Sequence, residues 1–434
     1  MAIISGCQKR EPGKETVPGR YEVAGPVETG GVSDDTSRDS RKEATDEATD
    51  EVTLAADKTS ESINIAETVS PDRVSIIMVG DILLHTPVEE AAKNAETGEY
   101  NYDFIFENTK DLIGNADLAI VNEEVIIGGE ELGVSGYPVF NAPYEAGDAL
   151  VKAGFDVVCH ATNHALDKGG KGIENCLDFW ENEHPDIKVT GIHTSKEKQD
   201  EICISEVNNI KIAVLNYTYG TNGIPLPVGK PYAVDLLEKE KVKRDLKKAE
   251  DEADFTIVVP HWGIEYRLQP SKDQEEWTSY FREYGADLVI GAHPHVIEPY
   301  VLYEDDTEGL SNNKNGGDML VYYSLGNFVN WTSGTGRGVA DRMLGGMANV
   351  DIIRNEDGSV SIDNYGVTDL VCHLEKGDGN VTVYPLSKYT EELASKNKII
   401  KQDPAFSLDY INELSNTVYG FDRPGNTIPK GNSL

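Results

Sequence analysis

Short apolar runs alternate with amphipathic segments along the chain from Val74 onward. Apolar runs of about 4 to 8 residues predict buried strands, and longer segments with helical periodicity predict helices between them. The predicted strands are VSIIMVGD (74–81), DLAIVNEE (117–124), DVVCHATN (156–163), KIAVLNY (211–217), FTIVVPHWG (255–263) and DLVIGAHPH (287–295). This alternation is typical of an α/β layered domain.

Amphipathic segments at 144–154, 169–182, 236–252 and 273–285 predict helices. The segment 236–252 has closely spaced lysine and glutamate, which predicts a solvated surface helix. After Gly317 apolar and polar residues alternate around N-E-D-G-S and G-D-G-N, which predicts antiparallel hairpins. From about Thr390 we expect a helical or irregular appendage.

The first 70 residues differ in character from the rest. Residues 8–70 hold 15 acidic and 8 basic residues but one aromatic, so they cannot bury enough apolar surface to fold. Cys7 follows Ile-Ser-Gly, which resembles the end of a bacterial lipoprotein signal. We therefore expect a lipid-anchored protein on the extracellular side of the bacterial membrane. The expected domains are a lipoprotein-type N-terminus with a disordered acidic linker (1–70), a folded domain (71–330), and a β-rich extension that completes the second sheet and ends in a tail (331–434).

Charge and cysteine spacing exclude several function classes. The formal net charge is -37, and nucleic-acid binding needs clustered lysine and arginine, so we expect no nucleic-acid partner. No apolar run reaches about 18 residues, so no membrane-spanning helix is predicted. The five cysteines show no C-x-x-C spacing, which argues against a zinc knuckle or a thioredoxin-like redox site.

Side chains able to bind metals follow the predicted strands at the point where each strand ends. Because the carboxyl ends of strands in an α/β sheet meet at one edge, these side chains are expected to converge on one site. Aspartate, glutamate, asparagine and histidine suit Zn, Mn or Fe. In GAHPHV, a period of two would put both histidines on one face of an extended segment. The strand-end residues are Asp81, Glu124, Asn163, His164, His261, His293 and His295.

Each motif alone also has an ordinary structural interpretation. Val-Gly-Asp after a strand forms turns, and Asn163 or Asp167 could cap a helix. His261 could pack in the core against Trp262. The glycine-rich segment 330–346, with Arg337 and Arg342, could be a hairpin connection or a loop that binds an anionic substrate.

The order of GDILLH, ADLAIVNEE, HATNHALDKGGKG, PHWGIEY, GADLVIGAHPHVIEP and YYSLGNF resembles the CapA family of poly-γ-glutamate capsule proteins, which is similar to the calcineurin-like metallophosphatases. The resemblance runs from about residue 74 to 330. It implies a metallophosphatase-like four-layer αββα sandwich, with added antiparallel strands at the C-terminal side.

The resemblance also implies roles for individual residues. His164 would protonate the leaving group and Asp167 would orient it. The implied ligands of one or two divalent ions (Mn, Zn or Fe) are Asp81, Glu124, Asn163, His261, His293 and His295. The expected substrate contacts are His85, Asn122, Glu265, Arg267, Asn327 and Arg337. Leu83 stands where the metallophosphatase pattern D-x-H has histidine, so one ion lacks a ligand.

The implied function is a metal-dependent hydrolase that acts on a phosphoester or a γ-glutamyl amide during synthesis or export of an anionic envelope polymer such as poly-γ-glutamate. The alternative is a non-catalytic component that binds the polymer within a capsule synthesis complex. A barrel-type amidohydrolase or deacetylase is disfavoured, because amidohydrolases place H-x-H at the first strand and here it follows the sixth.

Overall fold

The computed structural model describes residues 72–304, 318–375 and 381–420. All described residues belong to the unit Thr68–Leu434. The predicted lipidation site Cys7 and the acidic linker lie outside the described residues.

The first sheet is mixed and has β1 near its centre, with the strand order β14-β13-β12-β1-β2-β3-β4 and β11 paired to the end of β1. β1 pairs in parallel with β2, and β2 pairs in parallel with β3. Its strands are β1 (Arg73–Ile82), β2 (Leu118–Glu123), β3 (Val157–Cys159), β4 (Lys188–Thr190), β11 (Asn327–Val329), β12 (Leu344–Arg354), β13 (Val360–Leu374) and β14 (Val381–Pro385).

The second sheet has the order β5-β6-β7-β8-β10-β9, with β6, β7, β8 and β10 parallel to one another. β5 and β9 form its antiparallel edges. Its strands are β5 (Cys203–Val207), β6 (Ile210–Thr218), β7 (Phe255–His261), β8 (Leu288–Ile290), β9 (Ile297–Tyr303) and β10 (Met319–Leu325).

Helices border these strands. The α-helices are α1 (Thr86–Ala92), α2 (Asp103–Phe106), α3 (Lys110–Gly114), α4 (Tyr144–Ala153), α5 (Gly169–Glu183), α6 (Lys196–Gln199), α7 (Lys239–Glu252), α8 (Lys272–Glu283), α9 (Glu391–Lys396) and α10 (Leu408–Tyr419). The 3-10 helices are η1 (Glu130–Leu132), η2 (Ala340–Met343), η3 (Leu386–Lys388) and η4 (Lys398–Lys401). Within the part of the chain that the structure describes, no helix is both long and apolar enough to cross a membrane.

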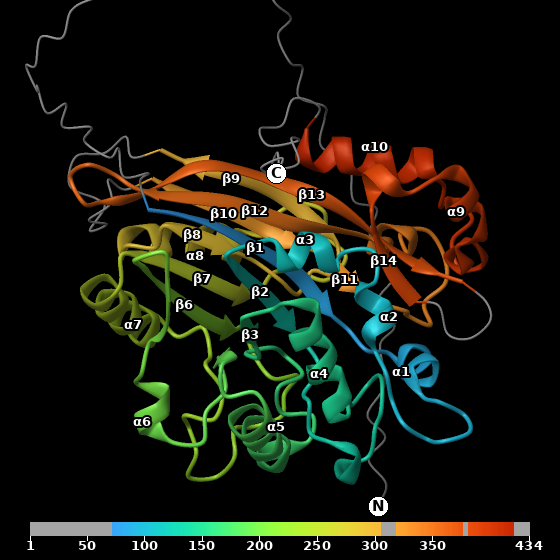
Figure 1. Cartoon of the computed structure of the whole chain (residues 1–434), viewed down its shortest axis with the longest axis horizontal. Helices are drawn as coiled ribbons and strands as arrows, with labels where there is room; N and C mark the ends of the chain where they lie inside the picture. The colour runs from blue at the N-terminus through green and yellow to red at the C-terminus, as the bar shows by residue number, and fades with distance from the viewer. Residues whose placement is uncertain (1–71, 305–317, 376–380, 421–434) are drawn as a thin grey trace, which may run out of the picture. The chain divides into compact units, whose positions relative to one another are not determined.

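The alternation of side chains along β6 identifies the layers. Ile212 and Val214 belong to the core shared by the two sheets, whereas Ala213 and Leu215 pack in a separate core with α7 and α8. Strands that are buried on both faces need continuous apolar runs, which is the pattern seen in the sequence. Figure 1 shows α7 and α8 along the second sheet and α4 beside β2 and β3 of the first. The predicted four-layer αββα sandwich is confirmed.

The strands after residue 330 join the first sheet, the one that contains β1. β12 pairs antiparallel with β1, from Arg73 opposite Ile353 to Val79 opposite Met347. β12 and β13 form the hairpin that the N-E-D-G-S turn predicts. Alternating polarity indicates a half-buried strand, but it does not indicate which sheet edge that strand will join.

Candidate metal centre

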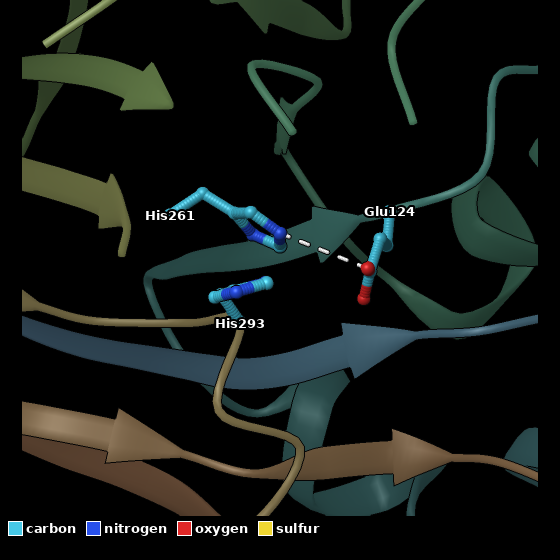
Figure 2. A group of neighbouring side chains, drawn as sticks. All are labelled: Glu124, His261 and His293. Carbon is cyan, nitrogen blue, oxygen red and sulfur yellow. Dashed lines mark ion pairs between the residues drawn. The ribbon is translucent and has the colours of Figure 1, made fainter. Parts of the chain in front are cut away.

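The carboxyl ends of strands from both sheets meet in one buried cluster. Asp81 lies near the end of β1, Glu124 follows β2, and His261 is the last residue of β7. All three side chains are fully buried. Nε2 of His261 lies 3.7 Å from Oε1 of Glu124, and Nδ1 lies 4.0 Å from Oδ1 of Asp81. Figure 2 shows the rings of His261 and His293 and the carboxylate of Glu124 pointing toward one another.

His293 and His295 also reach this cluster, but from a turn. β8 ends at Ile290, and the two histidines have φ of 99° and 59°. The expectation of an extended segment was therefore wrong, since the chain curls around Pro294 and thereby directs both rings inward. Nδ1 of His295 lies 3.2 Å from Oδ2 of Asp81 and 3.7 Å from Oε2 of Glu124.

Strained backbone is concentrated around the cluster. Among the described residues other than glycine, positive φ occurs at Asn222, Tyr266, His293 and His295 near the cluster, and elsewhere in the β5–β6 turn. Such conformations cost about 1 to 3 kcal/mol each and tend to occur at functional sites.

Glycines allow the close approach of the strands that carry the cluster. A Cβ at Gly80, next to Asp81, would lie 1.9 Å from the carbonyl oxygen of Gly326. A Cβ at Gly291 would lie 2.1 Å from the carbonyl oxygen of Tyr323. Neither distance is possible for a real side chain, so both motifs require glycine before their polar residues.

The segment after β3 adds an amide, Asn163, and a further histidine, His164. Oδ1 of Asn163 lies 3.0 Å from Nε2 of His261. Nδ1 of His164 lies 2.7 Å from Oδ2 of Asp167, and this same oxygen accepts the backbone N–H of Phe140 at 2.6 Å. The segment is fixed by Asn216 of β6, whose side chain accepts the N–H of Ala161 at 2.6 Å.

Opposite charges within the cluster shift the pKa values of its members. Burial and the nearby carboxylate of Glu124 raise the pKa of Asp81. Burial also opposes ionisation of Glu124, but His295 and His261 outweigh it and lower the pKa of Glu124. For His295, burial is outweighed by Glu124 and Asp81, which raise its pKa to about 9. The carboxylates and imidazoles therefore interact strongly within one buried cluster.

Several buried polar atoms in the cluster have no hydrogen-bond partner among the described residues. They are both carboxylate oxygens of Glu124, Nδ1 of His261 and Nδ1 of His293. Buried polar atoms are normally paired, because leaving one unpaired costs about 1 to 3 kcal/mol. A divalent cation would satisfy these atoms, and imidazole with carboxylate is a donor set that suits Zn, Mn or Fe.

Three overlapping groups of donor atoms could each hold an ion. In each group the atoms lie within 4.8 Å of one another, and the groups are Glu124-His261-His293, Asp81-Glu124-His295 and Glu265-His293-His295. Glu124 belongs to two of these groups. The predicted ligands thus converge, and the exposed Glu265 joins them.

Two of the expected substrate contacts instead position the candidate ligands. Nδ2 of Asn122 donates to Oδ1 of Asp81 at 2.9 Å, and Asn122 is fully buried. Oδ1 of Asn327 lies 3.1 Å from Nδ1 of His295. Burial first, and then the charge of His295, lower the pKa of His85 to about 4.

The remaining two expected contacts are exposed. Arg267 interacts electrostatically with Glu298, and Arg337 with Asp341. Arg342 lies nearer, since its guanidinium carbon is 3.6 Å from the centroid of the Tyr266 ring and its charge lowers the pKa of His85.

Tyr219 and Asn222, from the segment after β6, are part of the site and are absent from the predicted set. The ring of Tyr219 lies 4.6 Å from that of His293, and Nδ2 of Asn163 donates to Oδ1 of Asn222 at 3.3 Å. The sequence does carry a signal for them. KIAVLNY (211–217) is the one predicted strand to whose end no site residue was assigned.

A family model described as "Bacterial capsule synthesis protein PGA_cap" matches residues 75–332, which is more than half of the chain. The chain belongs to this PGA_cap family. The matched range includes Asp81 at one end and Asn327 at the other, and therefore contains every candidate metal ligand.

Two relatives of the PGA_cap chain carry the name CapA. It is 26% identical over 274 residues to the capsule biosynthesis protein CapA of Bacillus anthracis, covering 60% of this chain and 61% of the relative. It is 28% identical over 283 residues to the PGA biosynthesis protein CapA of Bacillus subtilis (strain 168), covering 61% of this chain and 66% of the relative. The match thus spans less than two thirds of each relative.

Solved structures show weaker similarity to this PGA_cap chain. A 5'-nucleotidase precursor from Thermus thermophilus has 13% identity and a TM-score of 0.41, covering 69% of this chain and 54% of its own. The NAD nucleotidase of Haemophilus influenzae has 12% identity and a TM-score of 0.40, covering 80% and 66%. The family assignment rests on the sequence matches alone.

Proposed function

We propose that this chain is a metal-dependent hydrolase of capsule biosynthesis, acting on a phosphoester or a γ-glutamyl amide of an anionic envelope polymer such as poly-γ-glutamate. The main support is the convergence of Asp81, Glu124 and His261 from two sheets. Glu124 and His261 have buried atoms without a hydrogen-bond partner among the described residues. The names of the capsule relatives support the process.

One or two divalent ions in this cluster would supply Lewis-acid charge to the scissile group and to the attacking water. His164 would then protonate the leaving group through Nε2, while Asp167 holds its Nδ1. In the structure Nε2 lies 3.4 Å from Nδ2 of Asn222, which the substrate would replace as its neighbour. Asn163 would help to hold an ion through its side-chain oxygen, which now contacts His261.

Arg342 is our candidate for binding the anionic part of the substrate. Its Nε is buried without a hydrogen-bond partner among the described residues. Its guanidinium stacks on Tyr266, whose ring centroid lies 6.0 Å from that of His295. A guanidinium held beside a metal centre suits a carboxylate or phosphate next to the bond that is cleaved.

The cellular setting is a further part of the proposal. Cys7 would be lipidated and the acidic linker would tether the hydrolase outside the cell membrane, where a capsule synthesis complex could assemble. The support comes from the sequence around Cys7. In the native host, Cys7→Ala should move the protein from the membrane fraction to the medium; unchanged membrane retention would refute lipid anchoring through this cysteine.

The test of hydrolysis combines metal analysis with substrate assays. Purified full-length protein should contain Mn, Zn or Fe by elemental analysis, and should hydrolyse phosphoesters or γ-glutamyl amides in a manner that a chelator abolishes. Protein that binds none of these metals and cleaves neither substrate class would contradict the proposal.

The alternative is a non-catalytic component that binds the polymer. Leu83, two residues after Asp81, offers no donor atom and weakens the case for two fully coordinated ions. For such a component, a chain with both Asn163→Ala and His261→Ala should support polymer formation as well as wild type. Loss of polymer with normal protein levels would exclude this alternative.

A further inference from the structure

We propose that Glu265 is a metal ligand, provided from the loop after β7, which completes the coordination of the ion bound by His293 and His295. The assignment deepens the proposed function and rests on the cluster binding a metal. It differs from the substrate contact that the sequence suggested for Glu265.

The position of Glu265 relative to both histidines carries the inference. One carboxylate oxygen of Glu265 and one ring nitrogen each of His293 and His295 lie within 4.8 Å of one another. Nδ1 of His293 is buried without a hydrogen-bond partner among the described residues. This nitrogen is therefore available to bind a metal ion. Among the carboxylates of the described residues, only Glu265, Asp81 and Glu124 belong to such groups.

The loop that carries Glu265 is held against the histidine turn. The backbone N–H of Tyr266 donates to the carbonyl of Pro294 at 2.7 Å, directly between His293 and His295. The guanidinium carbon of Arg342 lies 3.6 Å from the centroid of the Tyr266 ring. The approach of Glu265 therefore follows from the backbone arrangement and not only from the rotamer of an exposed side chain.

Neighbouring residues are poorer candidates for this coordination place. Leu83 lacks a donor atom. His85 interacts electrostatically with His295 and Glu124, but it belongs to none of the three donor groups. Its ring instead packs edge-on against Phe140, with centroids 5.2 Å apart.

A third carboxylate changes the metal that the cluster prefers. Imidazole suits zinc, copper, iron and nickel, whereas carboxylate oxygen suits manganese. With Glu265 bound, three carboxylates balance much of the charge of two divalent ions, which shifts preference toward Mn. Because Glu265 is the exposed member, its loss should leave the buried ligands in place.

The experiment measures Mn²⁺ binding without reference to catalysis. Full-length protein stripped by a chelator is titrated with Mn²⁺ by calorimetry, and free Mn²⁺ is counted by electron paramagnetic resonance. Glu265→Gln should weaken binding of one ion by roughly 10- to 100-fold, the effect seen when groups around a metal are altered. Glu265→Asp should restore part of the affinity, and Glu276→Gln, an exposed change on α8, should match wild type.

The outcomes separate this assignment from the proposed function. Equal Mn²⁺ affinity and stoichiometry for Glu265→Gln and wild type overturn the ligand assignment, whether or not KM for substrate rises. Wild-type protein that binds no Mn²⁺, Zn²⁺ or Fe²⁺ overturns the metal centre and the assignment with it. Metal binding that depends on Glu265, without any hydrolysis, supports the ligand and refutes only the hydrolase.

Discussion

Oδ2 of Asp167 accepts two bonds at once, one from the ring of His164 at 2.7 Å and one from the backbone N–H of Phe140 at 2.6 Å. The carboxylate therefore fixes the imidazole relative to the main chain. If His164 donates a proton to the leaving group, His164→Ala should lower kcat by roughly 10²- to 10⁴-fold with unchanged metal content. Steady-state kinetics and elemental analysis of the same preparations test this.

Asp167→Asn gives a finer test of the same pair. The amide can still accept the Phe140 N–H but loses the charge that stabilises a protonated His164, so kcat should fall while KM changes little. A substrate with a good leaving group, such as a nitrophenyl ester, needs little protonation and should be cleaved by either variant almost as fast as by wild type. If His164→Ala and Asp167→Asn lose as much activity on the nitrophenyl ester as on other substrates, His164 is not the acid.

Arg342 and Arg337 should differ in their effect on substrate binding. Arg342→Ala should raise KM for an anionic substrate by about tenfold or more, because a charge-assisted hydrogen bond contributes about 1.5 to 3 kcal/mol. Arg337→Ala serves as the matched control, since it interacts electrostatically with Asp341 and Tyr410. If Arg337→Ala raises KM more than Arg342→Ala does, Arg337 is the substrate contact, as the sequence predicts, and our assignment of Arg342 is wrong.

Gly80→Ala should disrupt the centre through the backbone. Its Cβ would lie 1.9 Å from the carbonyl oxygen of Gly326, so β1 and the β10–β11 junction must separate. We expect a loss of stability of about 1 to 3 kcal/mol or more, together with weaker metal binding. Gly114→Ala in α3 is the control, because the nearest atom to its Cβ would be 4.0 Å away. Thermal unfolding with and without Mn²⁺ measures both effects.

Glu89 gives the fold a pH dependence. Burial raises its pKa to about 8 from an ordinary 4.5, with partial compensation from the hydroxyl of Tyr102. Between these pH values the unfolded chain releases a proton that the folded chain retains. This contribution to stability is therefore present below pH 4.5 and is lost as the pH rises toward 8, by about 1.4 kcal/mol per pH unit.

Glu89→Gln should remove this dependence. The free energy of unfolding of the variant, minus that of wild type, should increase as pH rises from 4.5 to 8 in denaturant titrations. The exposed neighbour Glu90→Gln should show no such trend. A difference that is constant with pH would mean that Glu89 ionises normally in the folded protein.

Much of the site could be predicted because buried strands leave a clear pattern. In β1 and β7 an apolar run leads directly to Asp81 or His261, so the strand end marks the ligand. The same reasoning placed His293 and His295 in the cluster, but it gave the wrong backbone conformation for them. Periodicity assumes an extended chain, and the positive φ of both residues is imposed by the tertiary packing around them.

Contacts between distant loops were not predictable from one sequence. Tyr266 and Arg342 are far apart in the chain, and only the folded sheets bring the ring within 3.6 Å of the guanidinium carbon. Choosing Arg337 over Arg342 therefore had no pattern to guide it. The sequence also did not determine which sheet β12 would join. Its partner β1 lies next to it in space but far from it along the sequence.

The candidate ligands are divided between the two sheets, with Asp81 and Glu124 on one and His261, His293 and His295 on the other. An ion bound between them would act as a cross-link through the middle of the sandwich. Folding and metal uptake would then be a single linked equilibrium, with about 2.7 kcal/mol of extra stability when the free ion is at 100 times its Kd. Where the free ion is scarce, the two sheets would be held together by their apolar core alone, and the chain would persist as the less stable, metal-free form.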